Sequence, residues 1–202
     1  YTITQIGEKM LKDGCNAVDV VEKCCIELEN NELFNAGIGS SLDIECKVSH
    51  EAVLVDGKTL NYGAVCNSSI VKNPIRFAKL LLSNSIIVSG NSNIKKYYNT
   101  NLVNSKNKIK LFTTQKYFKS LYRKKLNKLI KDLDTVGVIA RDIYGNIASG
   151  SSTGGLTNRP SGRLGDTHIN GISTIADNRY GAIVVTGKGE NIIKHHVASN
   201  VF

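Results

Sequence analysis

The segment Asp134-Thr135-Val136-Gly137-Val138-Ile139-Ala140 is the most informative part of this sequence. Residues 136–140 are mostly apolar and rich in β-branched side chains, which predicts a strand. Residues 142–146 have the composition of a turn, and residues 147–149 predict the return strand of a hairpin. A threonine at the start of such a strand is usually structural. Whether Thr135 has a chemical role therefore depends on residues elsewhere in the sequence.

Two other polar clusters stand at expected strand ends. One is Ser152-Thr153-Gly154-Gly155, and the other is Thr186-Gly187-Lys188-Gly189, which closes a buried strand predicted at 180–186. Hydroxyl groups in such places supply a nucleophile and hydrogen-bond donors. Glycines beside them let backbone N–H groups approach a developing oxyanion closely. This combination suits acyl-transfer chemistry.

Common nucleotide-binding and serine-hydrolase motifs do not account for these clusters. Residues 150–154 fit G-x-S-x-G, but the glycines and Pro160 that follow prevent the helix that this motif requires after its serine. Residues 187–192 begin like a dinucleotide-binding G-x-G-x-x-G, yet the sixth position is Ile192. The sequence contains no P-loop and no H-E-x-x-H motif. We therefore expect no cofactor.

Metal binding is not predicted either. His195 and His196 are adjacent on a helix expected at 191–199, so they point in different directions and favour a solvated surface. The five cysteines lie in the first third of the chain without a C-x-x-C spacing. They favour free thiols in a reducing compartment.

The first third of the chain predicts helices and a hairpin. Apolar residues recur at helical spacing over 6–29, with a break at Asp13-Gly14 and Asn16 as the N-cap of the second half. Residues 50–65 predict short strands around a turn at Asp56-Gly57. Pro74 opens a helix that is expected to end at residue 82.

The net charge of +9 is concentrated in one segment. Residues 94–131 contain 12 of the 26 Lys and Arg residues and no Asp or Glu, which leaves 14 basic and 17 acidic residues elsewhere. A nucleic-acid-binding domain usually spreads its basic residues over a folded face. The Asn-, Lys- and Ser-rich composition from residue 83 onward instead favours a mobile, solvated linker.

In this order, the motifs resemble the signature of one enzyme family. The sequence is similar to the plant-type asparaginases, isoaspartyl peptidases and threonine aspartase, which are N-terminal-nucleophile hydrolases with a threonine nucleophile. The similarity covers residues 6–82 and 132–199. The matching segments are residues 34–40, 55–57, 63–65, 73–75, 134–137, 145–146, 152–155, 162–166 and 186–190.

This resemblance implies an α+β fold, the four-layer αββα sandwich of that class. It divides the chain into an N-terminal part (1–82), a basic mobile linker (83–134) and a catalytic part (135–202). The family's glycine-rich opening strand and its closing strands have no counterpart in the sequence, so we expect the sandwich to be truncated at both ends.

The resemblance also implies self-activation. Family members are made as precursors in which the bond corresponding to Asp134–Thr135 breaks autocatalytically. Thr135 then becomes a new N-terminus whose α-amine, with a pKa of roughly 7.7–8.0 in model compounds, accepts the hydroxyl proton. A mobile linker before this bond fits such a mechanism, because the released chain end must move away.

Further roles are carried over from the family residue by residue. Thr153 is expected to bond near the Thr135 hydroxyl, and Asn35 corresponds to a loop asparagine near the nucleophile. Thr186 and the Gly187 N–H are expected to form the oxyanion hole. For substrate binding, Arg163 is expected to hold the α-carboxylate and Asp166 the α-ammonium, beside Gly189.

The branch of the family is less clearly marked. Asp166 suits a free α-amine and favours hydrolysis of L-asparagine or β-aspartyl (isoaspartyl) peptides. Residues 56–65 and the basic linker look closer to threonine aspartase, an endopeptidase that cuts proteins after aspartate. A catalytically inactive member is a further alternative, although the retained threonines and Arg163 argue against it.

We expect a small-molecule or peptide substrate and a homodimer of cleaved protomers. Membrane binding is not predicted, because no apolar run has the length needed to cross a bilayer. Nucleic-acid binding is disfavoured. A cytoplasmic location is expected, with nuclear import through the basic linker as an alternative.

Overall fold

The computed structural model describes residues 2–101 and 134–202. The part of the expected linker (83–134) that spans residues 102–133 lies outside the described residues. Within the described ranges, no helix combines the length and the apolar character that crossing a membrane requires.

The chain begins with two helices, α1 (Thr2–Lys12) and α2 (Ala17–Glu29), separated at the predicted break. Asn16 is the N-cap of α2, and its side chain accepts a hydrogen bond from the backbone N–H of Asp19 over 2.8 Å. This contact satisfies one of the free N–H groups of the first turn. Asp19 adds the negative charge that this helix end favours.

A five-stranded mixed sheet forms the centre of the fold, in the order β3-β2-β1-β5-β4. The strands are β1 (His50–Asp56), β2 (Tyr62–Ser68), β3 (Ile87–Ser89), β4 (Val136–Arg141) and β5 (Ile147–Thr153). The pair β2–β3 is parallel, and the other three neighbouring pairs are antiparallel. Strands from both sides of the expected linker thus belong to one sheet, and β1 in its centre pairs directly with β5.

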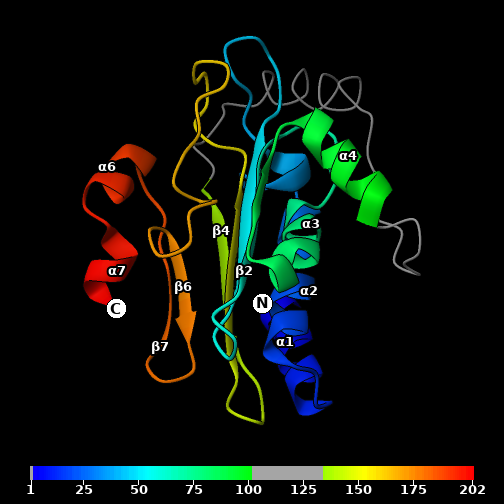
Figure 1. The fold of residues 1–202 in the computed structure, drawn as a ribbon, viewed down its shortest axis with the longest axis vertical. Helices are drawn as coiled ribbons and strands as arrows, with labels where there is room; N and C mark the ends of the chain where they lie inside the picture. The colour runs from blue at the N-terminus through cyan, green and yellow to red at the C-terminus, as the bar shows by residue number, and fades with distance from the viewer. Residues whose placement is uncertain (1, 102–133) are drawn as a thin grey trace.

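One face of this sheet is covered by helices (Figure 1). Side chains alternate between the two faces of a strand, so Ala52 and Leu54 of β1 point toward α2 and α3 (Pro74–Leu81) and join the main apolar core. Gly150 of β5 belongs to the same face, where a Cβ atom would lie 2.8 Å from a methyl carbon of Val21. The absent side chain lets α2 pack closely on the sheet.

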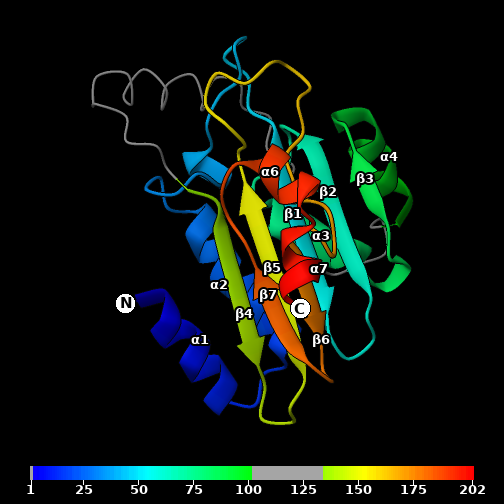
Figure 2. The same cartoon turned by 90° about the vertical axis from the view of Figure 1, so that its left-hand side faces the viewer.

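The opposite face carries a two-stranded antiparallel sheet, β6 (Thr174–Asp177) with β7 (Gly181–Val184), and beyond it two short helices, α6 (Gly189–Lys194) and α7 (Val197–Val201) (Figures 1 and 2). Val53 and Val55 of β1 pack against Ala176 on this side. Gly137 of β4 leaves the room that the Val184 side chain occupies. The described residues therefore combine α-helices with a mixed sheet, in agreement with the expected α and β content.

Three expectations need correction. The linker does not begin at residue 83, because β3 joins the sheet and helix α4 (Asn91–Asn101) follows it. Ile94 is fully buried and the Tyr97 ring packs edge-on against Phe77 at 6.0 Å, so a few apolar residues are enough to hold α4.

The helix expected at 191–199 is divided into α6 and α7 at His196, whose φ of 46° is left-handed. The strand at 180–186 is shorter and only half-buried, since β7 pairs with β6 alone among the described strands.

Candidate active site

Thr135 lies immediately before β4, at one end of the central sheet. The pairing of Val136 with Ser152 places Thr135 opposite Thr153, and the Thr135 hydroxyl donates a hydrogen bond to the Thr153 Oγ1 atom over 2.9 Å. The backbone N–H of Gly155 donates to the same oxygen over 3.0 Å. The Thr153 side chain is buried, so this oxygen is held rigidly beside the Thr135 hydroxyl.

Asn35 forms hydrogen bonds both to the residue before Thr135 and to the loop after Thr153. Its backbone N–H donates to the Asp134 carbonyl oxygen over 3.0 Å, and its carbonyl oxygen accepts from the Gly154 N–H over 2.9 Å. The side-chain amide donates to the Gly155 carbonyl oxygen over 2.7 Å and accepts from the Ser41 N–H over 2.8 Å. Asn35 thus holds the bond before Thr135 and the loop after Thr153 in fixed relative positions.

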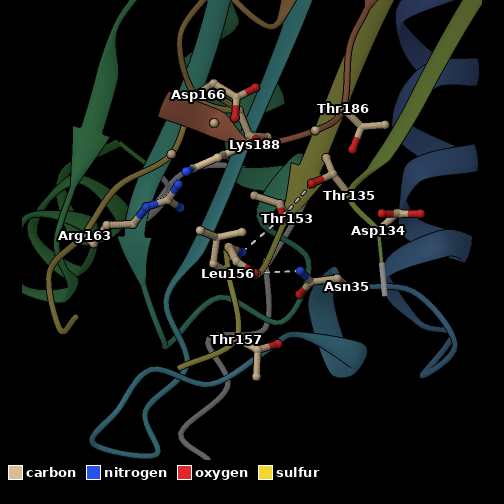
Figure 3. A pocket seen from close by; sticks show the side chains of 15 residues that line it. Asn35, Asp134, Thr135, Thr153, Leu156, Thr157, Arg163, Asp166, Thr186 and Lys188 are labelled. Carbon is tan, nitrogen blue, oxygen red and sulfur yellow. Dashed lines mark hydrogen bonds between the residues drawn. The ribbon is translucent and has the colours of Figure 1, made fainter. Parts of the chain in front are cut away.

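A cavity of about 390 Å³ opens beside Thr135 (Figure 3). Figure 3 shows Thr135, Thr153 and Asn35 on one side of it and Arg163 with Asp166 on the other. All nine site residues predicted from the sequence line this cavity, although they come from five separate stretches of the chain. They are Asn35, Asp134, Thr135, Thr153, Arg163, Asp166, Thr186, Gly187 and Gly189.

Arg163 and Asp166 do not pair with each other directly. Nε and Nη2 of Arg163 donate to one carboxylate oxygen of Glu190, over 2.9 and 2.8 Å. The Arg163 guanidinium lowers the pKa of Glu190. Asp166 is buried, and loss of hydration raises the pKa of its carboxyl group, an effect that the nearby Glu51 carboxylate reinforces.

Gly189 makes the close approach of these groups possible. A Cβ atom at this position would lie 2.8 Å from Oδ1 of Asp166 and 3.0 Å from Nη2 of Arg163. Gly187 has a φ of 153°, a conformation that residues with a side chain rarely adopt. Both glycines of the Thr186–Gly189 turn are therefore required by geometry, one for space and one for backbone conformation.

Several cavity residues were not predicted as site residues. Lys188 was recognised only as part of its motif, and Leu156 and Thr157 gave no signal because an isolated leucine or threonine in a loop has none. Among the described residues, no group of three His, Cys, Asp or Glu side chains is arranged as a metal site. All five cysteines are free, and His195 and His196 are exposed as expected.

Comparison with known proteins places the chain in the family that its ordered motifs resemble. The profile of the family described as asparaginase matches residues 1–202. The isoaspartyl peptidase/L-asparaginase of Macaca fascicularis is 36% identical over 203 residues, which cover 96% of this chain and 65% of that protein. The corresponding protein of Mus musculus is 36% identical over 95% of this chain and 61% of its own length. The isoaspartyl peptidase of Salmonella typhimurium is 32% identical over 98% of this chain and 67% of its own length.

The chain therefore belongs to the asparaginase family, as the ordered motifs predicted. It spans less than two thirds of the length of the two mammalian relatives.

Proposed function

We propose that this protein is a hydrolase that releases L-aspartate from L-asparagine or from β-aspartyl peptides, with Thr135 as its nucleophile. The observation that carries the proposal is the single cavity that joins the Thr135–Thr153 hydroxyl pair to Arg163 and Asp166. A small amino-acid substrate needs a nucleophile, a cation for its α-carboxylate and an anion for its α-ammonium within a few ångströms of each other. The names of the relatives support the same substrates.

Activation begins at the Asp134–Thr135 bond. The Thr135 oxygen attacks the Asp134 carbonyl carbon, the peptide nitrogen takes up the hydroxyl proton and leaves, and an ester replaces the amide. This first step already frees the α-amine of Thr135, and water then hydrolyses the ester, which releases the Asp134 carboxylate and restores the Thr135 hydroxyl. The hydrogen bond from the Asn35 N–H to the Asp134 carbonyl oxygen holds this carbonyl beside the nucleophile and polarises it.

Substrate hydrolysis repeats this chemistry on an external amide. The α-amine of Thr135 accepts the hydroxyl proton, and the oxygen attacks the substrate β-carbonyl. Thr186 and the Gly187 N–H stabilise the oxyanion, and the leaving ammonia or amino acid takes up the proton. Water hydrolyses the aspartyl ester and returns the enzyme. Arg163 and Asp166 hold the α-carboxylate and α-ammonium throughout.

The two alternatives are less well supported. An endopeptidase of the threonine-aspartase type would bind an uncharged amide nitrogen at the position of the substrate α-ammonium. Asp166 is a buried carboxylate, which is stable only beside a charged or hydrogen-bonded partner, so it suits the α-ammonium better. An inactive protein would not require the Thr135–Thr153 hydrogen bond beside an open cavity, and both are present here.

The larger assembly is part of the proposal. The succession of helices, central sheet, β6–β7 and α6–α7 supports a four-layer αββα sandwich of the N-terminal-nucleophile class. We also propose a homodimer of cleaved protomers and a cytoplasmic location, both expected from the sequence.

The test is incubation of the purified chain followed by intact-mass measurement and N-terminal sequencing, with Thr135→Ala as the control. We expect two fragments, the second beginning at Thr135, only in the protein with the native threonine. Release of L-aspartate from L-asparagine and β-aspartyl dipeptides is then measured. A chain that remains whole and releases no aspartate contradicts the proposal.

A further inference from the structure

A buried carboxylate lies beneath the segment that carries Arg163 and Asp166. Glu51 belongs to the central strand β1, and its side chain is 2% exposed. Oε1 of Glu51 accepts a hydrogen bond from the backbone N–H of Gly165 over 2.7 Å. Oε2 lies 2.7 Å from Nδ1 of His168, whose side chain is 12% exposed. One carboxylate thus binds the chain on both sides of Asp166.

Glu51 also stands in register with the threonine pair. Strand pairing aligns Glu51 of β1 with Thr153 of β5. Thr153 in turn is hydrogen-bonded to Thr135, the residue just before β4, so the three residues form one row at this end of the sheet. The pairing of β1 with β2 is irregular between His50 and Ala52, where a bulge or similar distortion interrupts the register. Such irregularities redirect a side chain locally. Glu51 is therefore fixed to the same rigid strands as the nucleophile while it reaches the substrate-binding segment.

The electrostatics require a partner for this carboxylate. A buried carboxyl group is tolerated when its oxygens are hydrogen-bonded, and here Oε1 is bonded to the Gly165 N–H and Oε2 to His168. Among the described residues, Arg159, Asp166 and Cys66 also interact electrostatically with Glu51. Arg159 is itself buried and donates to the carbonyl oxygens of Ser49 and Leu156.

We propose that Glu51 and His168 are positioning residues that hold Arg163 and Asp166 at the correct distance from Thr135. This inference deepens the proposed function and rests on it, because it assumes that Arg163 and Asp166 bind the substrate. Neither Glu51 nor His168 lines the cavity, so both act through the segment between them. Their loss weakens substrate binding while the threonine chemistry is retained.

The decisive variant is Glu51→Met, which keeps the volume of the side chain and removes both acceptors. We expect the KM for L-asparagine and the Ki of L-aspartate to rise about tenfold or more, because a hydrogen bond to a charged group is lost. We expect kcat to change less than about threefold. Glu51→Gln, which restores an acceptor for the Gly165 N–H, should recover part of the affinity.

The matched control is Glu29→Met. Glu29 is equally buried, on the helix-covered side of the same sheet, and binds the Ile75 N–H rather than the segment 163–168. A merely structural role for Glu51 predicts that Glu51→Met changes the melting temperature but leaves KM and Ki at the native values, as in Glu29→Met, and this result overturns the inference. If Glu51→Met does not fold, His168→Leu removes one of the two contacts and should raise KM severalfold. Unchanged affinity in that variant overturns the inference as well.

A second readout does not depend on activity. Trypsin cleavage after Arg163 reports local opening of the segment, and the fragment that begins at Leu164 is followed by mass spectrometry. We expect cleavage about tenfold faster in Glu51→Met than in Glu29→Met. If the native chain hydrolyses nothing, the proposed function fails, and equal cleavage rates in the two variants then overturn the positioning role separately.

Discussion

The hydroxyl of Thr135, the residue just before β4, donates a hydrogen bond to the hydroxyl of Thr153 at the end of β5, over 2.9 Å. Strand pairing alone brings the two residues together, since Val136 and Ser152 are neighbours in the ladder. A rigid sheet is a better support for a reacting group than a loop, because its backbone positions are held by hydrogen bonds on both sides. The alignment of the nucleophile is therefore a property of the central sheet.

Thr153→Val removes this hydrogen bond while it preserves the shape of the side chain. We expect self-cleavage after Asp134 and aspartate release to slow by about 10- to 100-fold, because the nucleophile loses the group that orients its proton. Fragment formation over time, followed by mass spectrometry, measures the first effect. Ser149→Ala is the control, since Ser149 lies on the same face of β5 and its hydroxyl has no hydrogen-bond partner among the described residues. Equal rates for Thr153→Val and the native chain would contradict this role.

Gly189→Ala places a methyl group against Asp166 and Arg163. The new carbon would lie 2.8 Å from the Asp166 Oδ1 atom, closer than a Cβ contact allows, so the two charged side chains must separate. We expect the KM for L-asparagine to rise about tenfold or more, with a smaller change in kcat, because binding depends on both charges. Steady-state kinetics tests this. A variant with native KM would show that Asp166 can move without loss of binding.

Glu29→Gln should stabilise the protein at neutral and alkaline pH. Burial raises the pKa of the Glu29 carboxyl group from 4.5 to about 7, although the hydrogen bond from the Ile75 N–H opposes the shift. The folded state thus holds more protons than the unfolded state between pH 4.5 and 7. The Glu29 carboxyl group therefore adds most to the free energy of unfolding below pH 4.5. Its contribution falls as the pH rises to about 7 and stays constant above that pH.

The glutamine variant lacks this titration. We expect its free energy of unfolding to match that of the native chain near pH 4.5 and to exceed it at pH 8, by an amount on the order of 1–3 kcal/mol. Urea denaturation at the two pH values measures the difference. A loss of stability that is equal at both values would mean that Glu29 is ionised in the folded state.

His50 gives the opposite pH dependence. Burial lowers the pKa of its imidazole from 6.5 to about 4, and hydrogen bonds with Gly37 and Val71 only partly offset this. The unfolded state holds more protons between pH 6.5 and 4, so the native chain loses stability as the pH falls through this range. His50→Asn should be less stable than the native chain at pH 7, and the difference should shrink toward pH 4. A difference that stays constant would contradict a buried neutral imidazole.

Local sequence patterns predicted most elements that are long or clearly bounded. The break at Asp13-Gly14, the Asn16 cap and the helix after Pro74 depend on interactions within a few residues, so a short window contains their cause. Strand β3 has three residues and pairs in parallel with β2, and its place depends on a partner that the window does not contain. The same reason explains why α4 was assigned to the linker.

The candidate site also has a part that local motifs predicted and a part that depends on distant contacts. The ordered motifs identified nine residues that line one cavity, because each motif is a local turn or strand end with recognisable glycines and hydroxyls. Glu51 and His168 are 117 residues apart and neither belongs to a recognisable pattern. The sequence by itself determined the family, the nucleophile proposed at Thr135 and the local shape of each loop. Only the tertiary structure decided that Glu51 lies beneath Asp166, because a contact between distant residues depends on strand register and layer packing.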